Sequence, residues 1–295
     1  SSSGRFSDAG SIPAASTIKS ATYANFSLSF LSGERGNLTE VDGKKPAYSG
    51  FFVNGQQKAE HIMSSMLYIS SPINALLEGF YRNDITFDML KEKGDFGIGT
   101  FNNLDGEMVA LSGSFFQLDL DGNAHPVDGR MKTPFAVMCQ FQPMLTEEIA
   151  APLSCAAFVQ RLAHILPSDN MFYAIHMVGL FRSVDTRSVP RTDNYRPLAE
   201  ATHDQKIRHF KNIEGHLVGF YTPSFIPSVN VPGYHFHFID KSLSAGGHLL
   251  RCEPNRLDIQ LQIFFSMELT LPKTLDYLTA SFERNVREDL EKAER

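Results

Sequence analysis

Residues Gly233–Leu250 read "GYHFHFIDKSLSAGGHLL" and place three of the chain's ten histidines close together in the sequence. On a β-strand, residues i and i+2 point to the same face, so His235 and His237 project from one side. The polar segment that follows them is short enough to reverse the chain. A hairpin that turns between residues 242 and 243 places His248 opposite His237. Three imidazoles then converge on one face of a sheet.

Three converging histidines predict a metal site. An isolated HxH on a strand is usually structural, but a third histidine in register completes the ligand set of a catalytic zinc site, which keeps its fourth position open. Imidazole also suits Fe, Cu, Ni and Co, so we expect Zn²⁺, with other divalent transition metals as alternatives. A cupin-like binding module stays open as a second interpretation. Its HxH continues to a glutamate, whereas this chain has Asp240 three residues after His237.

The composition limits the other classes of partner. The chain has 295 residues, of which 42% are hydrophobic and 20% charged, which is typical of a globular protein with one large domain or two modest ones. Its formal net charge of −6 argues against nucleic acid or an anionic membrane as the main partner. The sequence contains no apolar run of about 18 residues, the length that spans a bilayer, so we expect no membrane partner.

The order of the patterns predicts the fold class. The run 107–127 alternates in polarity like two strands joined at Ser112–Gly113, and "CAAFVQRLAHIL" from residue 155 has helical spacing. We expect an α+β (mixed α/β) protein with two sheet-based domains, mostly antiparallel or mixed strands and a few helices. The expected parts are a partly disordered amino-terminal extension (1–57), an N-terminal sheet domain (58–165) and a C-terminal metal-binding sheet domain with a terminal helix or tail (166–295).

Cysteines and the amino-terminal region bear on the compartment. Cys139, Cys155 and Cys252 form no CxxC pair, and three cysteines allow at most one disulfide. The chain begins at a serine, which suggests processing or truncation, and two N-x-S/T sequons start at Asn25 and Asn37. We therefore expect secretion, with the cytoplasm as the alternative.

Two further stretches offer polar groups that a metal enzyme needs. "GDFGIGTFNNLDGEM" carries Glu107 at the entry of an apolar strand, where it is either solvent-facing or buried with a partner. The glycines of this stretch lack the order and the strand–loop–helix context of a dinucleotide site, which we exclude. "VDTRSVPR" offers Arg187 and Arg191, and arginine is the residue that binds a carboxylate through two parallel hydrogen bonds. The terminal "REDLEKAER", which includes Glu294, has the pattern of a solvated helix.

Together these stretches resemble the α-acetolactate decarboxylase family. The matching runs occur in the order of the family from about residue 67 to the end, whereas residues 1–60 match none of them. The runs are "INALLEGFY", "GDFGIGTFNNLDGEM", "KTPFAV", "FYAI", "TRSVPR", "YRPLAE", "EGHLVGFYTP", "NVPGYHFHFID" and "GGHLL". The resemblance implies a two-domain enzyme with its metal between the domains and a small-molecule substrate. It also makes a homodimer plausible.

By motif, the resemblance implies a role for several residues. The implied zinc ligands are His235, His237 and His248; Glu107 lies beside the metal, Thr100 near the substrate, and Arg187 is the active-site arginine. A glutamate near the carboxyl terminus matches Glu294, with Glu291 as the alternative.

The reaction that the resemblance implies is decarboxylation of 2-acetolactate (2-hydroxy-2-methyl-3-oxobutanoate) to (R)-acetoin and CO₂. Zinc would chelate the ketone and hydroxyl oxygens and stabilise an enediolate, while Arg187 orients the carboxylate. Glu107 and Glu294 are the candidates for moving protons, and the sequence does not assign one as acid and the other as base. A metal-binding protein without catalysis and a metal-dependent hydrolase remain alternatives.

Overall fold

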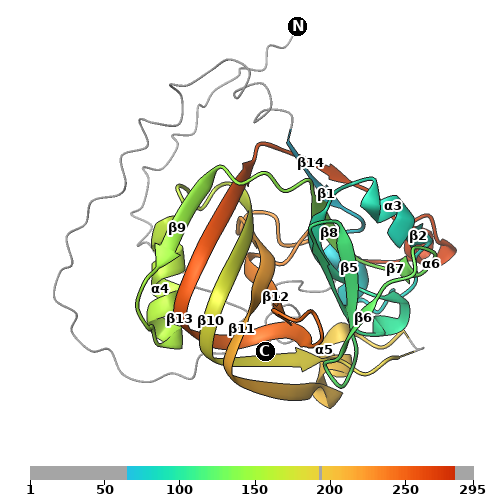
Figure 1. The fold of residues 1–295 in the computed structure, drawn as a ribbon. Coiled ribbons are helices and arrows are strands. Elements are labelled where there is room, and N and C mark those ends of the chain that lie inside the picture. The colour runs from blue at the N-terminus through green and yellow to red at the C-terminus, as the bar shows by residue number, and fades with distance from the viewer. Residues whose placement is uncertain (1–64, 193–194, 283–295) are drawn as a thin grey trace, which may run out of the picture.

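Strands dominate the computed structural model, which describes residues 65–192 and 195–282 (Figure 1). Among the described strands, every pairing is antiparallel except the parallel pair formed by the first and last strands. The mixed α+β class with mostly antiparallel strands and few helices is therefore confirmed.

Two large sheets lie side by side in Figure 1. The first has seven strands in the order β14 (Ser266–Leu269), β1 (Met66–Ile69), β8 (Ala136–Cys139), β3 (Phe96–Thr100), β4 (Glu107–Leu111), β5 (Ser114–Leu118) and β6 (Ala124–Pro126). The second has five in the order β10 (Phe172–Ser188), β11 (Lys206–Thr222), β12 (Gly233–Asp240), β13 (Gly246–Phe264) and β9 (Leu145–Ile149), and β10 also pairs with β13. A two-stranded sheet joins β2 (Ile85–Thr86) to β7 (Lys132–Thr133).

The helices are short, and the longest covers the outer face of the second sheet (Figure 1). This helix is α4 (Cys155–Ile165), whose first turn is capped because the Ser154 hydroxyl accepts a hydrogen bond from the main-chain nitrogen of Ala157 at 3.3 Å. The others are α2 (Ile73–Leu77), α3 (Phe87–Lys91), α5 (Leu198–Ala201), α6 (Leu275–Thr279) and the 3₁₀ turns η2 (Asn102–Leu104) and η3 (Thr202–Asp204). No helix in the described ranges is long and apolar enough to cross a membrane.

Apolar clusters lie on both faces of the second sheet. One fills the space between the two sheets, with Phe96 from β3 and Phe220 from β11 among its members. Another lies between the second sheet and α4, where Phe158 and Leu162 of the helix are buried. Burial on both faces explains why the long strands of this sheet are rich in apolar residues.

The expected pair of strands joined at Ser112–Gly113 is confirmed. β4 and β5 are joined at Ser112 and Gly113, which both have positive φ angles (50° and 78°), as a tight hairpin turn requires.

The expected division of the chain near residue 165 stays a prediction. β9, which lies before that boundary, pairs with β13, and β14, which lies after it, pairs with β1. The extension 1–57, its two sequons and the terminal tail from residue 283 lie outside the described residues.

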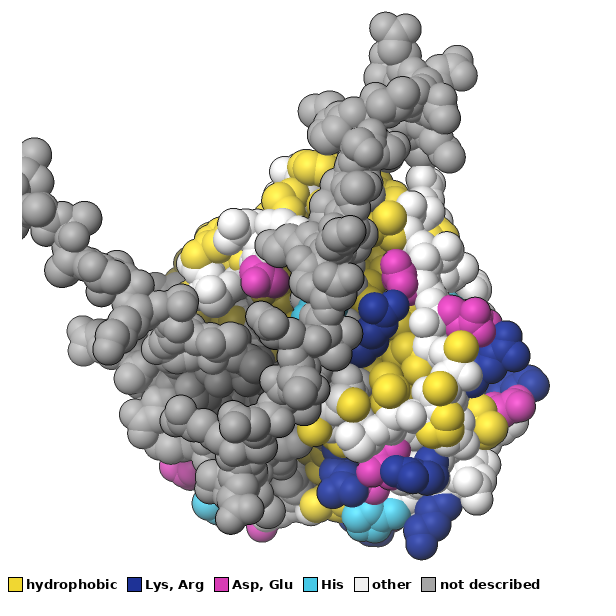
Figure 2. All heavy atoms as spheres, turned by 90° about the vertical axis from the view of Figure 1, so that its left-hand side faces the viewer, with side chains coloured by type: hydrophobic (Ala, Val, Ile, Leu, Met, Phe, Trp, Pro, Cys, Tyr) yellow, Lys and Arg dark blue, Asp and Glu magenta, His cyan; other side chains and the backbone are white. Residues whose placement is uncertain are grey.

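Charged side chains of both signs lie next to each other on the face that Figure 2 shows. Exposed ion pairs also join the second sheet to its helix and its strands to each other: Arg161 on α4 pairs with Glu147 on β9 at 2.9 Å, and Arg256 on β13 pairs with Glu148 on β9 at 3.2 Å. Such exposed pairs contribute little to stability, about 0–1 kcal/mol each.

Candidate metal centre and active site

The hairpin formed by β12 and β13 has the register that the sequence predicts. His237 lies directly opposite His248 in the ladder. The carboxylate of Asp240 fixes the turn, because its Oδ1 accepts hydrogen bonds from the main-chain nitrogens of Ser244 (2.7 Å) and Ala245 (2.8 Å). Asp240 therefore stabilises the turn that sets the histidine register, rather than replacing the glutamate of a cupin motif.

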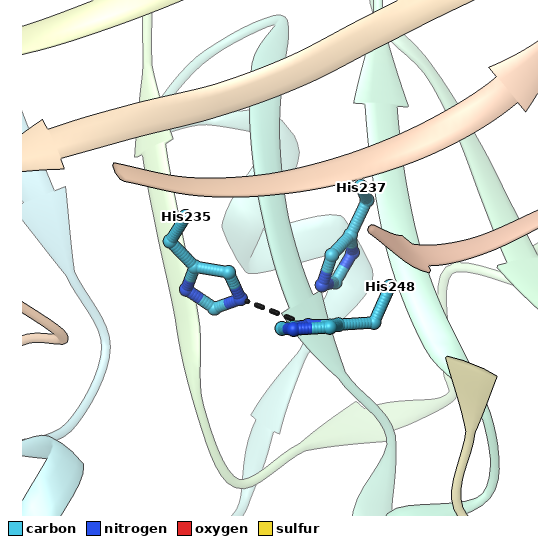
Figure 3. Close-up of side chains that lie close together, drawn as sticks. All are labelled: His235, His237 and His248. Carbon is cyan, nitrogen blue, oxygen red and sulfur yellow. Dashed lines mark hydrogen bonds between the residues drawn. The ribbon is translucent and has the colours of Figure 1, made fainter. Parts of the chain in front are cut away.

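The three histidine rings of this hairpin point toward one another (Figure 3). One ring nitrogen from each residue lies within 4.8 Å of the others, and His235 Nε2 is 3.3 Å from His248 Nδ1. The residues are 9%, 1% and 2% exposed for His235, His237 and His248, respectively. Within the described ranges this is the only group of three or more His, Cys, Asp or Glu residues close enough to hold a metal ion.

The first sheet orients one of these rings. His237 Nδ1 lies 2.8 Å from the main-chain oxygen of Met108 on β4. A carbonyl oxygen only accepts hydrogen bonds, so Nδ1 carries a proton, and Nε2 is the nitrogen available to a metal ion. Metal-binding histidines commonly have their second nitrogen held in this way. The same Nε2 is 3.5 Å from Oε2 of Glu107.

Glu107 reaches the histidines from the hairpin formed by β3 and β4. It lies opposite Thr100 in the ladder, and the Thr100 hydroxyl donates a hydrogen bond to the main-chain oxygen of Gly106 at 2.8 Å. Gly106 has φ +96°, and a Cβ there would lie 2.5 Å from the main-chain oxygen of Leu118, so the turn requires glycine. The Glu107 side chain is 14% exposed. Of the two environments expected for it, the partly buried one beside a partner is found.

Arg187 lies near the end of β10, opposite His248. It is 4% exposed, its Nη1 donates to Oε1 of Gln205 at 3.2 Å, and its Nη2 lies 3.4 Å from His248 Nε2. Its buried Nε has no hydrogen-bond partner among the described residues. A buried guanidinium with donors to spare fits a carboxylate ligand. Arg191, by contrast, is exposed and lies 3.7 Å from Asp105 at the surface.

The three histidines, Glu107, Thr100 and Arg187 all line one cavity. It contains about 520 Å³ of empty space, including the part open to solvent. Its polar lining is Thr100, Glu107, Arg187, His235, His237 and His248, and its apolar lining is Ile73, Leu76, Leu104, Phe135, Val189 and Leu198.

Several parts of the site were not predicted from the sequence. The apolar wall comes mainly from α2, α5 and the residues after β10, and the helical spacing of "INALLEGF" signals only that Ile73 and Leu76 share a face. No sequence pattern indicated that Gln205 contacts Arg187 or that the main chain of Met108 contacts His237. Glu294 and Glu291 lie outside the described residues, so the structure does not test their assigned positions.

These features define a protein of two packed sheets with a candidate transition-metal site and a buried arginine in the cavity between them. The family model described as "Alpha-acetolactate decarboxylase" matches residues 67–284. A protein of that name from Methanosarcina mazei is 41% identical over 264 residues, which is 89% of this chain and 91% of the relative.

Another relative with that name, from Bacillus licheniformis, is 40% identical and covers 74% of this chain and 87% of its own. Among solved structures, the crystal structure of alpha-acetolactate decarboxylase from Bacillus subtilis strain 168 has a TM-score of 0.76 at 38% identity. It covers 78% of this chain and 99% of that one. The chain therefore belongs to the alpha-acetolactate decarboxylase family.

Membership makes the chain an enzyme, a carboxy-lyase that acts on a small molecule, acetolactate. One of the matches corrects the expectation that residues 1–60 have no counterpart in the family. The match to the Methanosarcina mazei protein covers 89% of this chain, a share that residues 58–295 alone do not reach. The similarity therefore extends into the amino-terminal region.

Proposed function

We propose that the protein converts 2-acetolactate to (R)-acetoin and CO₂, with Zn²⁺ or another divalent transition metal held by His235, His237 and His248. The observation that carries the proposal is the convergence of three buried imidazoles, a carboxylate and an arginine on one cavity. Family membership supplies the reaction class, and the site residues supply the mechanism.

The donor set fits a transition metal. Three neutral imidazoles without a thiolate match the ligands that zinc prefers in catalytic sites, where a fourth position stays open for substrate or water. Nδ1 of His237 is already committed to Met108, which leaves Nε2 for the ion. When bound, the metal supplies a Lewis acid that stabilises the negative charge left on the substrate as CO₂ departs.

Arg187 is proposed to bind the substrate carboxylate. Its guanidinium lines the cavity next to His248, and Gln205 holds one of its nitrogens. Too tight an ion pair would oppose the loss of CO₂, because the carboxylate loses its charge in the reaction. The contribution of Arg187 is therefore orientation of the carboxylate relative to the ketone, rather than strong binding.

Glu107 is proposed to move a proton. Its carboxylate faces the metal-binding nitrogen of His237, so it lies beside the oxygens of a substrate held at the histidines. One proton must reach the former carboxylate-bearing carbon from a single face to give one acetoin enantiomer. We propose that Glu107 and Glu294 share the two proton transfers, and that the Thr100 hydroxyl contacts the substrate beside Glu107.

The apolar wall completes the site. Ile73, Leu76 and Leu198 also line the cavity, where they would contact the methyl groups of the substrate and exclude water. Exclusion of water strengthens the electrostatic contacts of the arginine and the carboxylate with the substrate.

The test is an assay of the purified full chain with racemic acetolactate, with and without a chelator, measuring CO₂ and acetoin together. We expect equal amounts of the two products, loss of both after chelation and recovery on addition of Zn²⁺. Chiral gas chromatography should show one acetoin enantiomer.

Each alternative gives a different result. A binding protein would take up metal and release no CO₂, and a metal-dependent hydrolase would cleave ester substrates in preference to acetolactate. Full activity of metal-free protein would refute the metal site. We also propose a homodimer, on the family resemblance alone; a monomer mass in sedimentation velocity would contradict it.

A further inference from the structure

Two of the three cysteines lie opposite each other at the edge of β13. β9 pairs antiparallel with β13 up to Ile149, and the chain then continues along the same edge. The main-chain nitrogen of Leu153 donates to the oxygen of Pro254 at 2.9 Å. Because the two segments run in opposite directions, Cys155, two residues further on, comes level with Cys252, two residues back.

The two cysteines lie close together on the side of the second sheet that α4 covers. Cys252 is fully buried in the apolar cluster between the second sheet and α4, and Cys155 is the first residue of α4 and is partly exposed. Burial raises the pKa of the Cys155 thiol, and a hydrogen bond from the main chain of Cys252 partly opposes that rise. The nearby Cys155 adds to the effect of burial in raising the pKa of Cys252.

We propose that Cys155 and Cys252 form a disulfide site that fastens the first turn of α4 to β13. The hydrogen bond from the Cys252 main chain to the Cys155 thiol places that sulfur beside Cys252, and a disulfide needs Cα atoms roughly 4.4–6.8 Å apart. Cys139 is excluded as a partner because it lies on β8 of the other sheet, buried in the cluster between the sheets.

The oxidant is a small-molecule or protein disulfide. The partly exposed Cys155 attacks it first as a thiolate, which forms a mixed disulfide and releases one thiol. The thiolate of Cys252 then attacks the Cys155 sulfur and releases the second thiol. In sum, the two protein thiols lose two electrons and two protons, and the oxidant gains them as two thiols.

This bond would act on the strand that carries the histidines. The Tyr234 hydroxyl donates to the main-chain oxygen of Leu162 in α4 at 2.8 Å, and Tyr234 directly precedes His235. A covalent link at the start of α4 restricts the separation of this helix from the sheet. The expected consequence is slower unfolding and a higher melting temperature, with the site geometry unchanged.

The experiment uses the full chain, purified with reductant and then incubated with oxidised glutathione or kept reduced. Free thiols are blocked by alkylation, and peptides from a non-reducing digest are identified by mass spectrometry. We expect a linked peptide pair that contains Cys155 and Cys252, in the parent protein and in the matched control Cys139→Ala. Oxidation should raise the melting temperature by roughly 5 °C in both, and this shift should vanish in Cys155→Ala.

Two results would overturn the proposal. One is glutathione retained on Cys155 with Cys252 still reduced, which would show that the thiols cannot meet. The other is a linked pair that contains Cys139. Both are read in the parent protein, so the answer does not depend on the folding of any variant, and it is independent of acetolactate turnover.

Discussion

Two groups of histidines on the same face of the second sheet have different environments. His235, His237 and His248 converge beside a carboxylate and an arginine. His176 on β10 and His216 on β11 face the same first sheet, yet only two rings meet there. The two groups share their residue type, their sheet and their face, so the side chains around them cause the difference in environment.

The His176–His216 pair has the environment of a neutral core pair. Its rings stack with centroids 5.3 Å apart, and His176 Nε2 lies 3.1 Å from His216 Nδ1. Phe96 presents its ring to His176, and Gln260 Oε1 lies 3.3 Å from His176 Nδ1. Burial lowers the pKa of His176 to about 4, and it also lowers the pKa of His216. Histidines therefore indicate a metal site when three converge with charged groups, and a structural pair when aromatic rings enclose two of them.

The largest expected effect separates the two groups by metal content. His237→Ala should lose bound metal and reduce kcat/KM at least about 100-fold, because one of the three proposed ligands is removed. The matched change in the other group, His216→Ala, should retain metal. Inductively coupled plasma mass spectrometry of both variants, beside the acetoin assay, makes the comparison. Equal metal loss in both variants would break the distinction.

The second largest expected effect concerns Arg187, the positively charged residue beside the three converging histidines. Arg187→Lys keeps the positive charge but loses the planar pair of donors, so kcat/KM should fall roughly 100-fold while metal content stays unchanged. The exposed Arg191→Lys serves as control and should match the parent protein. Loss of metal from Arg187→Lys would mean that the arginine acts on the ligands instead of the substrate.

The third effect concerns stability and the second group. The folded pKa of His176, about 4, is below the value of about 6.5 of an unfolded histidine. The unfolded chain therefore gains a proton as the pH falls below about 6.5 while the folded chain does not. This contribution to stability is present above that pH and is lost on the way down to pH 4.

Urea unfolding at pH 7 and pH 5 measures this contribution. The parent protein should lose on the order of 2 kcal/mol more than His176→Gln between the two pH values, since glutamine does not titrate. Identical pH dependence in the two proteins would show that His176 is not held neutral by burial.

The smallest expected effect concerns two glutamines, Gln205 beside Arg187 and Gln260 beside His176. Gln205→Ala should reduce kcat/KM about 10-fold, because Arg187 loses the group that holds its Nη1. Gln260→Ala, next to His176, should leave turnover unchanged. Steady-state kinetics of the two variants gives the result, and an equal fall in both would argue for a general effect on the sheet.

The sequence predicts local parts of the site better than distant ones. The hairpin register follows from residue numbers within one segment, so the opposition of His237 and His248 could be computed in advance. The pairing of Arg187 with His248 joins residues far apart in sequence, and no local pattern encodes it. The same holds for the contact of His237 with Met108, because it depends on how two sheets pack.

In the fold, too, local elements could be predicted from the sequence and long-range pairings could not. The hairpin of β4 and β5 and the helix α4 follow from alternation, turn residues and helical spacing. The placement of β9 in the second sheet and of β14 in the first could not be predicted, because strand order depends on long-range packing.

The parallel pairing of β1 with β14 has a consequence for synthesis of the chain. Met66 pairs with Ser266, so one edge of β1 stays without its partner until two hundred more residues have been translated. At about 5–20 residues per second, that interval is roughly 10–40 s. An uncovered strand edge is a template for pairing with other chains. The last strand therefore closes a surface that nascent chains expose to one another on the ribosome, and truncation before residue 266 should favour aggregation.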